Sequence, residues 1–233
     1  MSATIAVALD VPDLGTVRSV SAQVAPHVST LKVGLEVFLR DGRAAIEAAM
    51  SAANDAGSPC DVFLDLKLHD IPNTVAGAAK SVADISPKFL TVHASGGAAM
   101  IAAAAEALPD TLIVAVTVLT SLSQSELEAI GWNEPARDLA VRMAVQSVAA
   151  GARAIVCSPQ EVSAIRMAVP DEVLLITPGV RPPGSDVGDQ SRIATPVQAA
   201  QDGANILVIG RPITAAPDPG RAAAEIAATL KAN

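Results

Sequence analysis

Short runs of apolar and β-branched residues recur at roughly even intervals along the 233-residue chain. Eight of them are typical of strands, at residues 5–9, 30–33, 62–67, 89–93, 112–118, 154–157, 173–177 and 206–209. Alanine-rich segments with helical spacing follow them, at residues 14–24, 44–56, 75–84, 98–107, 136–149, 159–168, 196–202 and 221–230. This alternation predicts an α/β fold, a single (β/α)8 TIM barrel spanning residues 1–233 as one domain.

Polar or glycine-rich residues follow the ends of most of these strands. They are Asp10, residues 32–34, 67–70, 93–97, 117–121 and 178–181, and Gly210 with Arg211. In a closed barrel, the carboxyl ends of the strands meet on one face, where active sites lie. An open doubly wound sheet has the same alternation of elements, but charges at so many strand ends favour closure.

The predicted third strand places two charges where apolar side chains are expected. Alternate residues of a strand point to opposite sides, so Phe63, Asp65 and Lys67 share one face. Burying an ion is costly unless it is paired, so we expect the opposite charges of Asp65 and Lys67 to pair on this face. Asp70, just past the strand, is expected to lie close to Lys67 as well. Two carboxylates would keep Lys67 protonated, so that it acts as an acid. The alternative is a structural salt bridge inside the barrel.

Two further charged residues are expected beside this pair. Lys32 ends the second strand, which neighbours the third if the strand order is sequential, and it would extend the array into a chain of alternating charge. Asp10 closes the first strand and could accept hydrogen bonds from sugar hydroxyls. Each also has a simpler interpretation, Lys32 as a surface lysine and Asp10 as the cap of the following helix.

Arginines follow the last two strands, where barrels often build a phosphate site. The guanidinium groups of Arg181 and Arg211, with backbone amides at Gly210 and Arg211, suit a phosphate dianion. Residues 178–192 form a long polar loop rich in Pro and Gly, which we expect to act as a lid. Gln190 lies in this loop and could reach the phosphate. The alternative is that both arginines are solvated charges.

Composition narrows the choice of partner and compartment. The net charge of −8 argues against nucleic acid and anionic membranes as partners. No apolar run approaches the roughly 20 residues that span a bilayer. Cys60 and Cys157 are too few for a disulfide framework, and no apolar leader precedes the first strand, so we expect a cytoplasmic protein.

Sequence motifs for metals and cofactors are not found. The histidines, His27, His69 and His93, show no metal-ligand spacing, and no Walker loop or dinucleotide fingerprint is present. We therefore expect neither a metal nor a cofactor. His93 either lines the end of the barrel or is a hydrogen-bonded core residue.

Seven segments resemble, in order along the chain, the orotidine 5'-phosphate decarboxylase family. They are ALD at 8–10, LKVG at 31–34, DLKLHDIPNT at 65–74, VHASGG at 92–97, VTVLTS at 116–121, PGVR at 178–181 and VIGRPI at 208–213. The resemblance implies cofactor-independent decarboxylation of orotidine 5'-phosphate to uridine 5'-phosphate (UMP) and CO2. This reaction is the last step of de novo pyrimidine biosynthesis, and the resemblance implies that a homodimeric barrel catalyses it.

The resemblance also implies catalytic roles. Lys67 is expected to stabilise the C6 carbanion and protonate it, with Asp65 near the departing carboxylate. Lys32 is expected to contact the ribose and hold Asp65. Asp70 and Thr74 are expected to reach into the active site of the neighbouring subunit, so that each site needs both chains.

The other implied roles concern binding of the nucleotide. Asp10 is expected to bind the ribose hydroxyls, and Thr120 and Ser121 match the loop that contacts the pyrimidine. Implied phosphate contacts come from Gln190, Gly210 and Arg211, with Arg181 at the base of the lid.

Three alternatives to this function are considered. A magnesium-dependent sugar-phosphate decarboxylase or hexulose-phosphate synthase of the same superfamily tends to have an acidic residue at the position of Lys32, so Lys32 argues against it. A Schiff-base aldolase would need Lys67 as a neutral amine, which flanking carboxylates oppose. A non-catalytic nucleotide-binding barrel would bind UMP without turnover.

Overall fold

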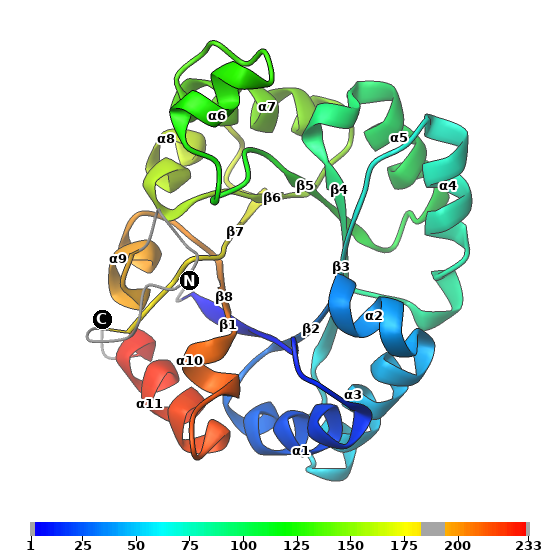
Figure 1. Cartoon of the computed structure of the whole chain (residues 1–233), viewed down its shortest axis with the longest axis vertical. Helices are drawn as coiled ribbons and strands as arrows, with labels where there is room; N and C mark the ends of the chain where they lie inside the picture. Colours follow the sequence, from blue (N-terminus) through cyan, green and yellow to red (C-terminus); the bar gives the residue numbers. More distant parts are fainter. Residues whose placement is uncertain (1–2, 183–193, 232–233) are drawn as a thin grey trace.

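Eight parallel strands close into a barrel in the computed structural model, which describes residues 3–182 and 194–231. The strand order is sequential, and β1 pairs with β8 to complete the ring (Figure 1). The strands are β1 (Thr4–Ala8), β2 (Thr30–Gly34), β3 (Asp61–Leu68), β4 (Phe89–His93), β5 (Leu112–Val116), β6 (Ala154–Val156), β7 (Leu174–Thr177) and β8 (Ile206–Ile209). The closed ring confirms the predicted barrel and excludes the open sheet.

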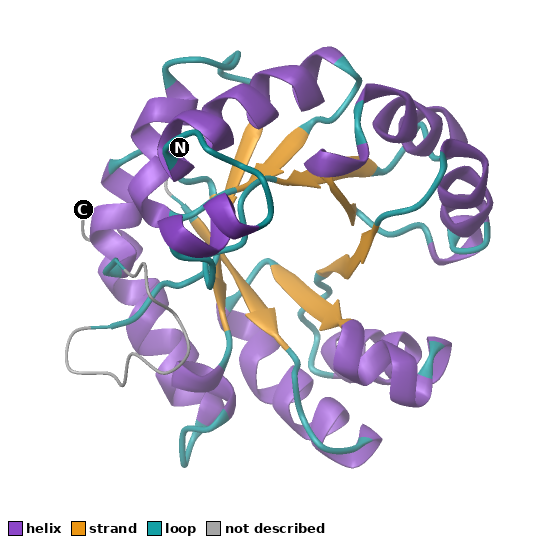
Figure 2. Cartoon of the chain, turned by 45° about the horizontal axis from the view of Figure 1, so that its top comes forward, coloured by secondary structure: helices purple, strands orange, loops and turns teal. Residues whose placement is uncertain are grey.

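Helices surround the ring of strands, as Figure 2 shows. They are α1 (Leu14–Val24), α2 (Leu35–Asp41), α3 (Arg43–Asp55), α4 (Pro72–Lys80), α5 (Ala98–Ala107), α6 (Gln124–Ala129), α7 (Ala136–Ala149), α8 (Val162–Arg166), α9 (Pro196–Gln201), α10 (Arg211–Thr214) and α11 (Pro219–Lys231), with short 3₁₀ turns between some of them. The periodic pattern gave α1, α5 and α7 with their observed bounds. It missed α2 and α10, and it placed the start of α4 at residue 75, although Pro72 is well suited to a first helical turn.

The period-two pattern of the strands separates two apolar regions. One fills the inside of the barrel, where the rings of Phe63 and Phe89 lie with their centroids 5.4 Å apart. The other lies between the strands and the helices, and includes Leu64 and Leu90, the chain neighbours of those two aromatic residues. The alanine-rich face of α3 belongs to this outer region. Small side chains let the helices pack closely against the barrel.

The connection from β5 to α7 contains the short helix α6, which the Ser-x-x-Glu pattern at residues 123–126 predicts. The Ser123 hydroxyl accepts a hydrogen bond from the Glu126 amide, and the Glu126 carboxylate accepts one from the Ser123 amide at 2.8 Å. This reciprocal capping box confirms the expected start of the helix.

The base of the predicted lid is closed by backbone pairing. Val180 forms an isolated bridge with Ala194, and the Arg181 amide donates to the Ala194 carbonyl at 2.9 Å. Residues 183–193, which include Gln190, lie outside the described part of the chain. No helix within residues 3–182 and 194–231 has the length and apolar character needed to span a membrane.

Candidate active site

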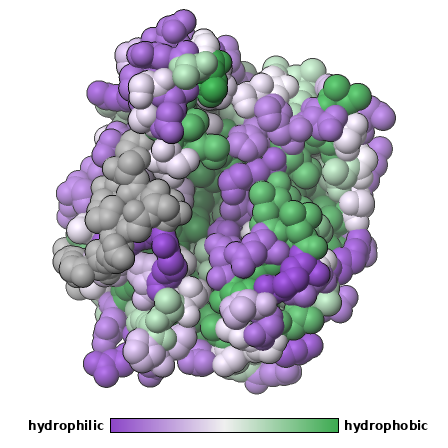
Figure 3. All heavy atoms as spheres, viewed as in Figure 1, coloured by the Kyte–Doolittle hydropathy of each residue, from purple (hydrophilic) through white to green (hydrophobic). Residues whose placement is uncertain are grey.

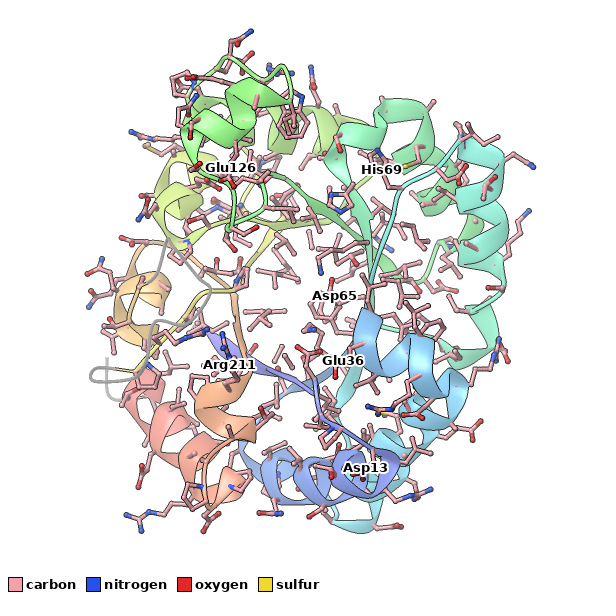
Figure 4. All side chains as sticks on the ribbon, in the orientation of Figure 1. Asp13, Glu36, Asp65, His69, Glu126 and Arg211 are labelled. Carbon is pink, nitrogen blue, oxygen red and sulfur yellow. The ribbon has the colours of Figure 1, made fainter. Side chains whose placement is uncertain are left out.

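The carboxylate of Asp65 joins two ammonium groups at the carboxyl end of the barrel. Its Oδ1 lies 2.7 Å from Lys67 Nζ and its Oδ2 lies 3.3 Å from Lys32 Nζ. Lys32 Nζ is also 3.7 Å from Asp10 Oδ1, just beyond the end of β1. Asp65 points toward the centre of the ring in Figure 4. The structure thus brings together Asp10, Lys32, Asp65 and Lys67, four residues that the sequence analysis selected.

The side chains of these ion pairs are largely buried. The side chains of Lys32 and Asp65 are 7% and 14% exposed, and that of Lys67 is 28% exposed. Burial alone would raise the pKa of Asp65, but the ammonium groups of Lys32 and Lys67 outweigh it and hold that pKa below its ordinary value. Asp65 is therefore ionised at neutral pH.

Strand β3 is irregular where it carries Lys67. The register with β4 pairs Leu64 with Leu90 and then Leu68 with Val92, so an insertion lies between these pairs. Lys67 has a φ of 50°, a left-handed conformation that costs a non-glycine residue about 1–2 kcal/mol. The hydroxyl of Thr91, on β4, accepts a hydrogen bond from the Lys67 amide at 2.8 Å. Sequence reasoning missed both the irregularity and Thr91.

Asp70 does not join this cluster within the chain. Its Oδ1 accepts a hydrogen bond from the Ile71 amide at 2.7 Å, and both residues are exposed. Among residues 3–182 and 194–231, the ion pair of Lys67 is with Asp65 and not with Asp70. The expectation that two carboxylates of one chain flank Lys67 is therefore wrong, because the chain turns outward into α4 after the strand ends. Thr74 lies on the exposed first turn of α4.

Two adjoining cavities open beside the charged cluster. One, of about 580 Å³, extends over β1, β2 and β8 and is also lined by Arg181, Gly210 and Arg211. The other, of about 310 Å³, is more apolar and is also lined by Thr120 and Ser121. Both share lining residues, which are Lys32, Asp65, Lys67, Pro178 and Val208. Together they offer a polar end and an apolar end, with the ammonium groups between them.

The polar end contains the predicted phosphate residues that the structure describes. Arg181 is buried, and its Nη1 donates to the Val180 carbonyl at 3.0 Å. Arg211 is exposed at the start of α10, and in Figure 4 it lies across the barrel from Asp65. Figure 3 shows this face of the molecule, where hydrophilic and hydrophobic residues both border its centre.

A larger cavity, of about 690 Å³, lies at the opposite end of the barrel. Its lining includes Asp61, Lys88 and Thr111, which stand at or just before the starts of β3, β4 and β5. It shares no lining residue with either cavity of the charged cluster. The chemistry of the lining, rather than volume, therefore locates the candidate active site.

His93, beside the charged cluster, is neutral at neutral pH. Burial lowers the pKa of His93, and the neighbouring His69 and Lys67 lower it further. The His69 and His93 rings lie with their centroids 5.4 Å apart. In the described part of the chain, no group of three His, Cys, Asp or Glu residues is placed to hold a metal ion.

Comparison with known proteins assigns the chain to a family. The family model described as "Orotidine 5'-phosphate decarboxylase / HUMPS family" matches residues 3–226. The chain belongs to this family. It is 61% identical to the orotidine 5'-phosphate decarboxylase of Thermobifida fusca (strain YX) over 231 residues, covering 99% of this chain and 97% of the relative. The corresponding enzyme of Frankia casuarinae is 53% identical over 242 residues, covering 99% and 88%.

A solved structure agrees with these relatives. The crystal structure of orotidine 5'-phosphate decarboxylase from Lactobacillus acidophilus matches with a TM-score of 0.82 at 34% identity, over 99% of both chains. The predicted family and enzyme class are confirmed. The protein decarboxylates orotidine 5'-phosphate in pyrimidine biosynthesis. The aldolase and the non-catalytic barrel are thereby excluded as the function.

Gly34 lacks a side chain, and this leaves space for Asp10 and Lys32 of the charged cluster. A Cβ atom at this position would lie 2.8 Å from Asp10 Oδ1 and 2.9 Å from Lys32 Nζ. We expect Gly34→Ala to lower kcat/KM about 10- to 100-fold, because both groups must move. The φ of −93° suits alanine, so the unfolding free energy should change by less than about 1 kcal/mol. Steady-state kinetics and urea unfolding measure the two effects.

Gly77→Ala is the matched control for this change. Gly77 lies within α4, and a Cβ there would have no neighbour within 4 Å. It should keep wild-type activity. Equal kinetics for Gly34→Ala and the wild-type protein would show that the cluster tolerates displacement.

The lowered pKa of Asp65 predicts how its contribution to stability depends on pH. Breaking a buried ion pair typically costs about 3–5 kcal/mol. We therefore expect Asp65→Asn to lower the free energy of unfolding by about 3–5 kcal/mol at pH 7. Because the folded pKa lies below the ordinary 3.8, the contribution of the carboxylate is complete above about pH 5 and is lost as the pH falls through the folded pKa. Urea unfolding of both proteins should therefore give a constant difference between about pH 5 and pH 8 that shrinks below 3.8. A difference that widens in acid would contradict this assignment.

Proposed function

We propose that the Lys67 ammonium stabilises the carbanion formed at C6 of the substrate and then protonates it. The observation that carries this proposal is the position of Lys67. Its Nζ lies 2.7 Å from Asp65 Oδ1, and Lys67 lines both cavities. The bond between C6 and the carboxylate carbon breaks, its electron pair stays on C6, and CO2 leaves. A proton then moves from Nζ to C6, and solvent restores the ammonium.

The electronic demand of this step explains why a fixed cation is required. The electron pair left on C6 occupies an sp² orbital that no ring carbonyl can delocalise, so positive charge must already be at that atom. Asp65, next to the leaving carboxylate, would favour its departure through like-charge repulsion. Enzymes lower barriers by about 8–23 kcal/mol, whereas one electrostatic donor supplies about 3–4 kcal/mol. The rest must come from binding groups that position the substrate and exclude water.

The binding groups would hold the nucleotide across the two cavities. Thr120 and Ser121 would contact the pyrimidine at the apolar end. Asp10 and Lys32 would hold the ribose between the two ends. At the polar end, Arg211 and Gly210 would contact the phosphate, with Arg181 at the base of the predicted lid. The predicted phosphate contact of Gln190 lies outside the described residues.

We propose that the reaction needs no metal or other cofactor. The family description also names HUMPS. The alternative from the sequence analysis is a magnesium-dependent sugar-phosphate decarboxylase or hexulose-phosphate synthase of the same superfamily. Lys32 Nζ stands 3.3 Å from Asp65 and 3.7 Å from Asp10, so an ammonium already occupies the place between these two carboxylates. A divalent cation at the same place would be repelled. Activity that survives complete chelation would support this interpretation, and activity restored only by Mg²⁺ would refute it.

We further propose a homodimer with shared active sites. Asp70 and Thr74 are exposed just after β3 and on the first turn of α4, and Asp70 accepts a hydrogen bond from the Ile71 amide. Two apolar side chains after β2 and β3 are also exposed, Leu39 of α2 at 79% and Ile71, next to Asp70, at 67%. Pairing of two such faces would bury this apolar surface and bring Asp70 to the partner's Lys67.

The chain would form one catalytic domain over residues 1–233 and act in the cytoplasm, where the buried thiols of Cys60 and Cys157 stay reduced.

Removing the Lys67 amine tests the mechanism. We expect Lys67→Ala to lower kcat by at least about 10⁴-fold, because both the electrostatic donor and the proton source are lost. The loss of ultraviolet absorbance of orotidine 5'-phosphate measures turnover, with a chelator present throughout. Lys88→Ala removes an exposed lysine at the other end of the barrel and should be fully active. A tenfold or smaller loss in Lys67→Ala would remove this residue from the mechanism.

Mixing two inactive variants tests the shared site. If Asp70 completes the partner's site, a heterodimer of Asp70→Ala and Lys67→Ala chains contains one site that lacks both groups and one intact site. Activity should therefore appear after subunit exchange, up to about a quarter of the wild-type value at equal mixing if exchange is random. Exchange is verified independently with differently tagged chains. No recovery of activity despite proven exchange would contradict the shared site.

A further inference from the structure

Thr91 lies inside the barrel beneath the charged cluster. It is the middle residue of β4, and it points inward like Phe89, two residues before it, which packs in the interior. Its side chain is fully buried, with an exposed fraction of 0%. Thr91 does not line either cavity of the candidate site. It is therefore a buried polar residue with no role in the binding scheme described above.

The strand register places Thr91 opposite the irregular part of β3. Leu64 pairs with Leu90, and Leu68 pairs with Val92. Between these pairs, Asp65, Leu66 and Lys67 all face the single residue Thr91. An insertion of this kind disrupts the ladder and redirects side chains. The backbone of Lys67 therefore needs a hydrogen-bond partner other than the regular ladder.

The Thr91 hydroxyl provides that partner and also binds the central carboxylate. It accepts a hydrogen bond from the Lys67 amide at 2.8 Å and donates one to Asp65 Oδ1 at 3.1 Å. A hydroxyl has one proton and two lone pairs, so both bonds can exist together. The same Asp65 oxygen accepts the hydrogen bond from Lys67 Nζ at 2.7 Å. One hydroxyl thus links the strained backbone of Lys67 to the carboxylate that holds its ammonium.

We propose that Thr91 is a positioning residue for the decarboxylation, which fixes Lys67 and Asp65 in the geometry required at C6. The proposal rests on the roles of Lys67 and Asp65 proposed above. Thr91 acts through these two residues and does not touch the substrate. Its loss should therefore impair the chemical step more than nucleotide binding.

Thr91→Val tests this role because valine keeps the shape and removes the hydroxyl. The variant loses a hydrogen bond to the charged Asp65 carboxylate, and we expect this loss to lower kcat about 10- to 100-fold. The dissociation constant for UMP, measured by calorimetry, should change less than about threefold. Thr91→Ser restores the hydroxyl and should recover kcat to within about threefold of wild type. Circular dichroism and urea unfolding establish that each variant is folded.

Thr111→Val is the matched control. Thr111 is also buried, at 4% exposed, and its hydroxyl donates to the Pro87 carbonyl at 2.8 Å at the other end of the barrel. This variant removes a comparable buried hydrogen bond and should keep wild-type kcat. A loss of kcat equal to that of Thr91→Val would mean that general destabilisation is the cause, and would overturn the proposal.

Two other results would also overturn it. A kcat for Thr91→Val within twofold of wild type would show that the hydroxyl is not required. Equal impairment of Thr91→Ser and Thr91→Val would show that the effect does not come from the hydroxyl. Failure of the underlying mechanism is distinguishable, because it would appear as substantial activity in Lys67→Ala assayed beside these variants.

Discussion

The position of the Asp65 carboxylate between two ammonium groups is the interaction on which the active site depends. Each of its oxygens faces a different lysine, at 2.7 Å for Lys67 and 3.3 Å for Lys32. Without that carboxylate, two cations would lie buried next to one another at the barrel mouth, a costly arrangement. Without the lysines, burial would push the carboxylate toward its neutral form. The three charges are therefore stable only together, and the adjacent strands β2 and β3 hold them together.

The closed barrel makes this arrangement rigid and gives it a local charge unlike that of the whole chain. The protein carries a net charge of −8, yet the larger cavity beside the cluster is lined by four basic and three acidic residues. A substrate bearing a phosphate and a carboxylate would enter a region of local positive charge in an otherwise acidic molecule. The cluster is held by adjacent strands and by its own ion pairs, so little reorganisation is needed during the reaction.

Sequence reasoning predicted the regular parts of this structure well. Alternating strands and helices identified the barrel, and the period of two put Asp65 and Lys67 on its inner face. The left-handed conformation of Lys67 was not predictable, because it arises from the register between β3 and β4, which neither strand encodes locally. Thr91 was missed for the same reason. A threonine in a β-branched strand is ordinary, and its role depends on residues 24 and 26 positions away in sequence.

The outcome for Asp70 shows how a local pattern can mislead about distance. The spacing from Lys67 to Asp70 suggested contact within one chain, but the strand ends between them and α4 starts on the outside. Lys67 consequently has one carboxylate partner from its own chain among the described residues, and part of its side chain remains exposed. Such an ammonium can accept a second carboxylate from outside the chain, and Asp70 of another copy has the right charge and exposure. The separation of Asp70 from Lys67 within one chain is therefore what the proposed shared site between two chains requires.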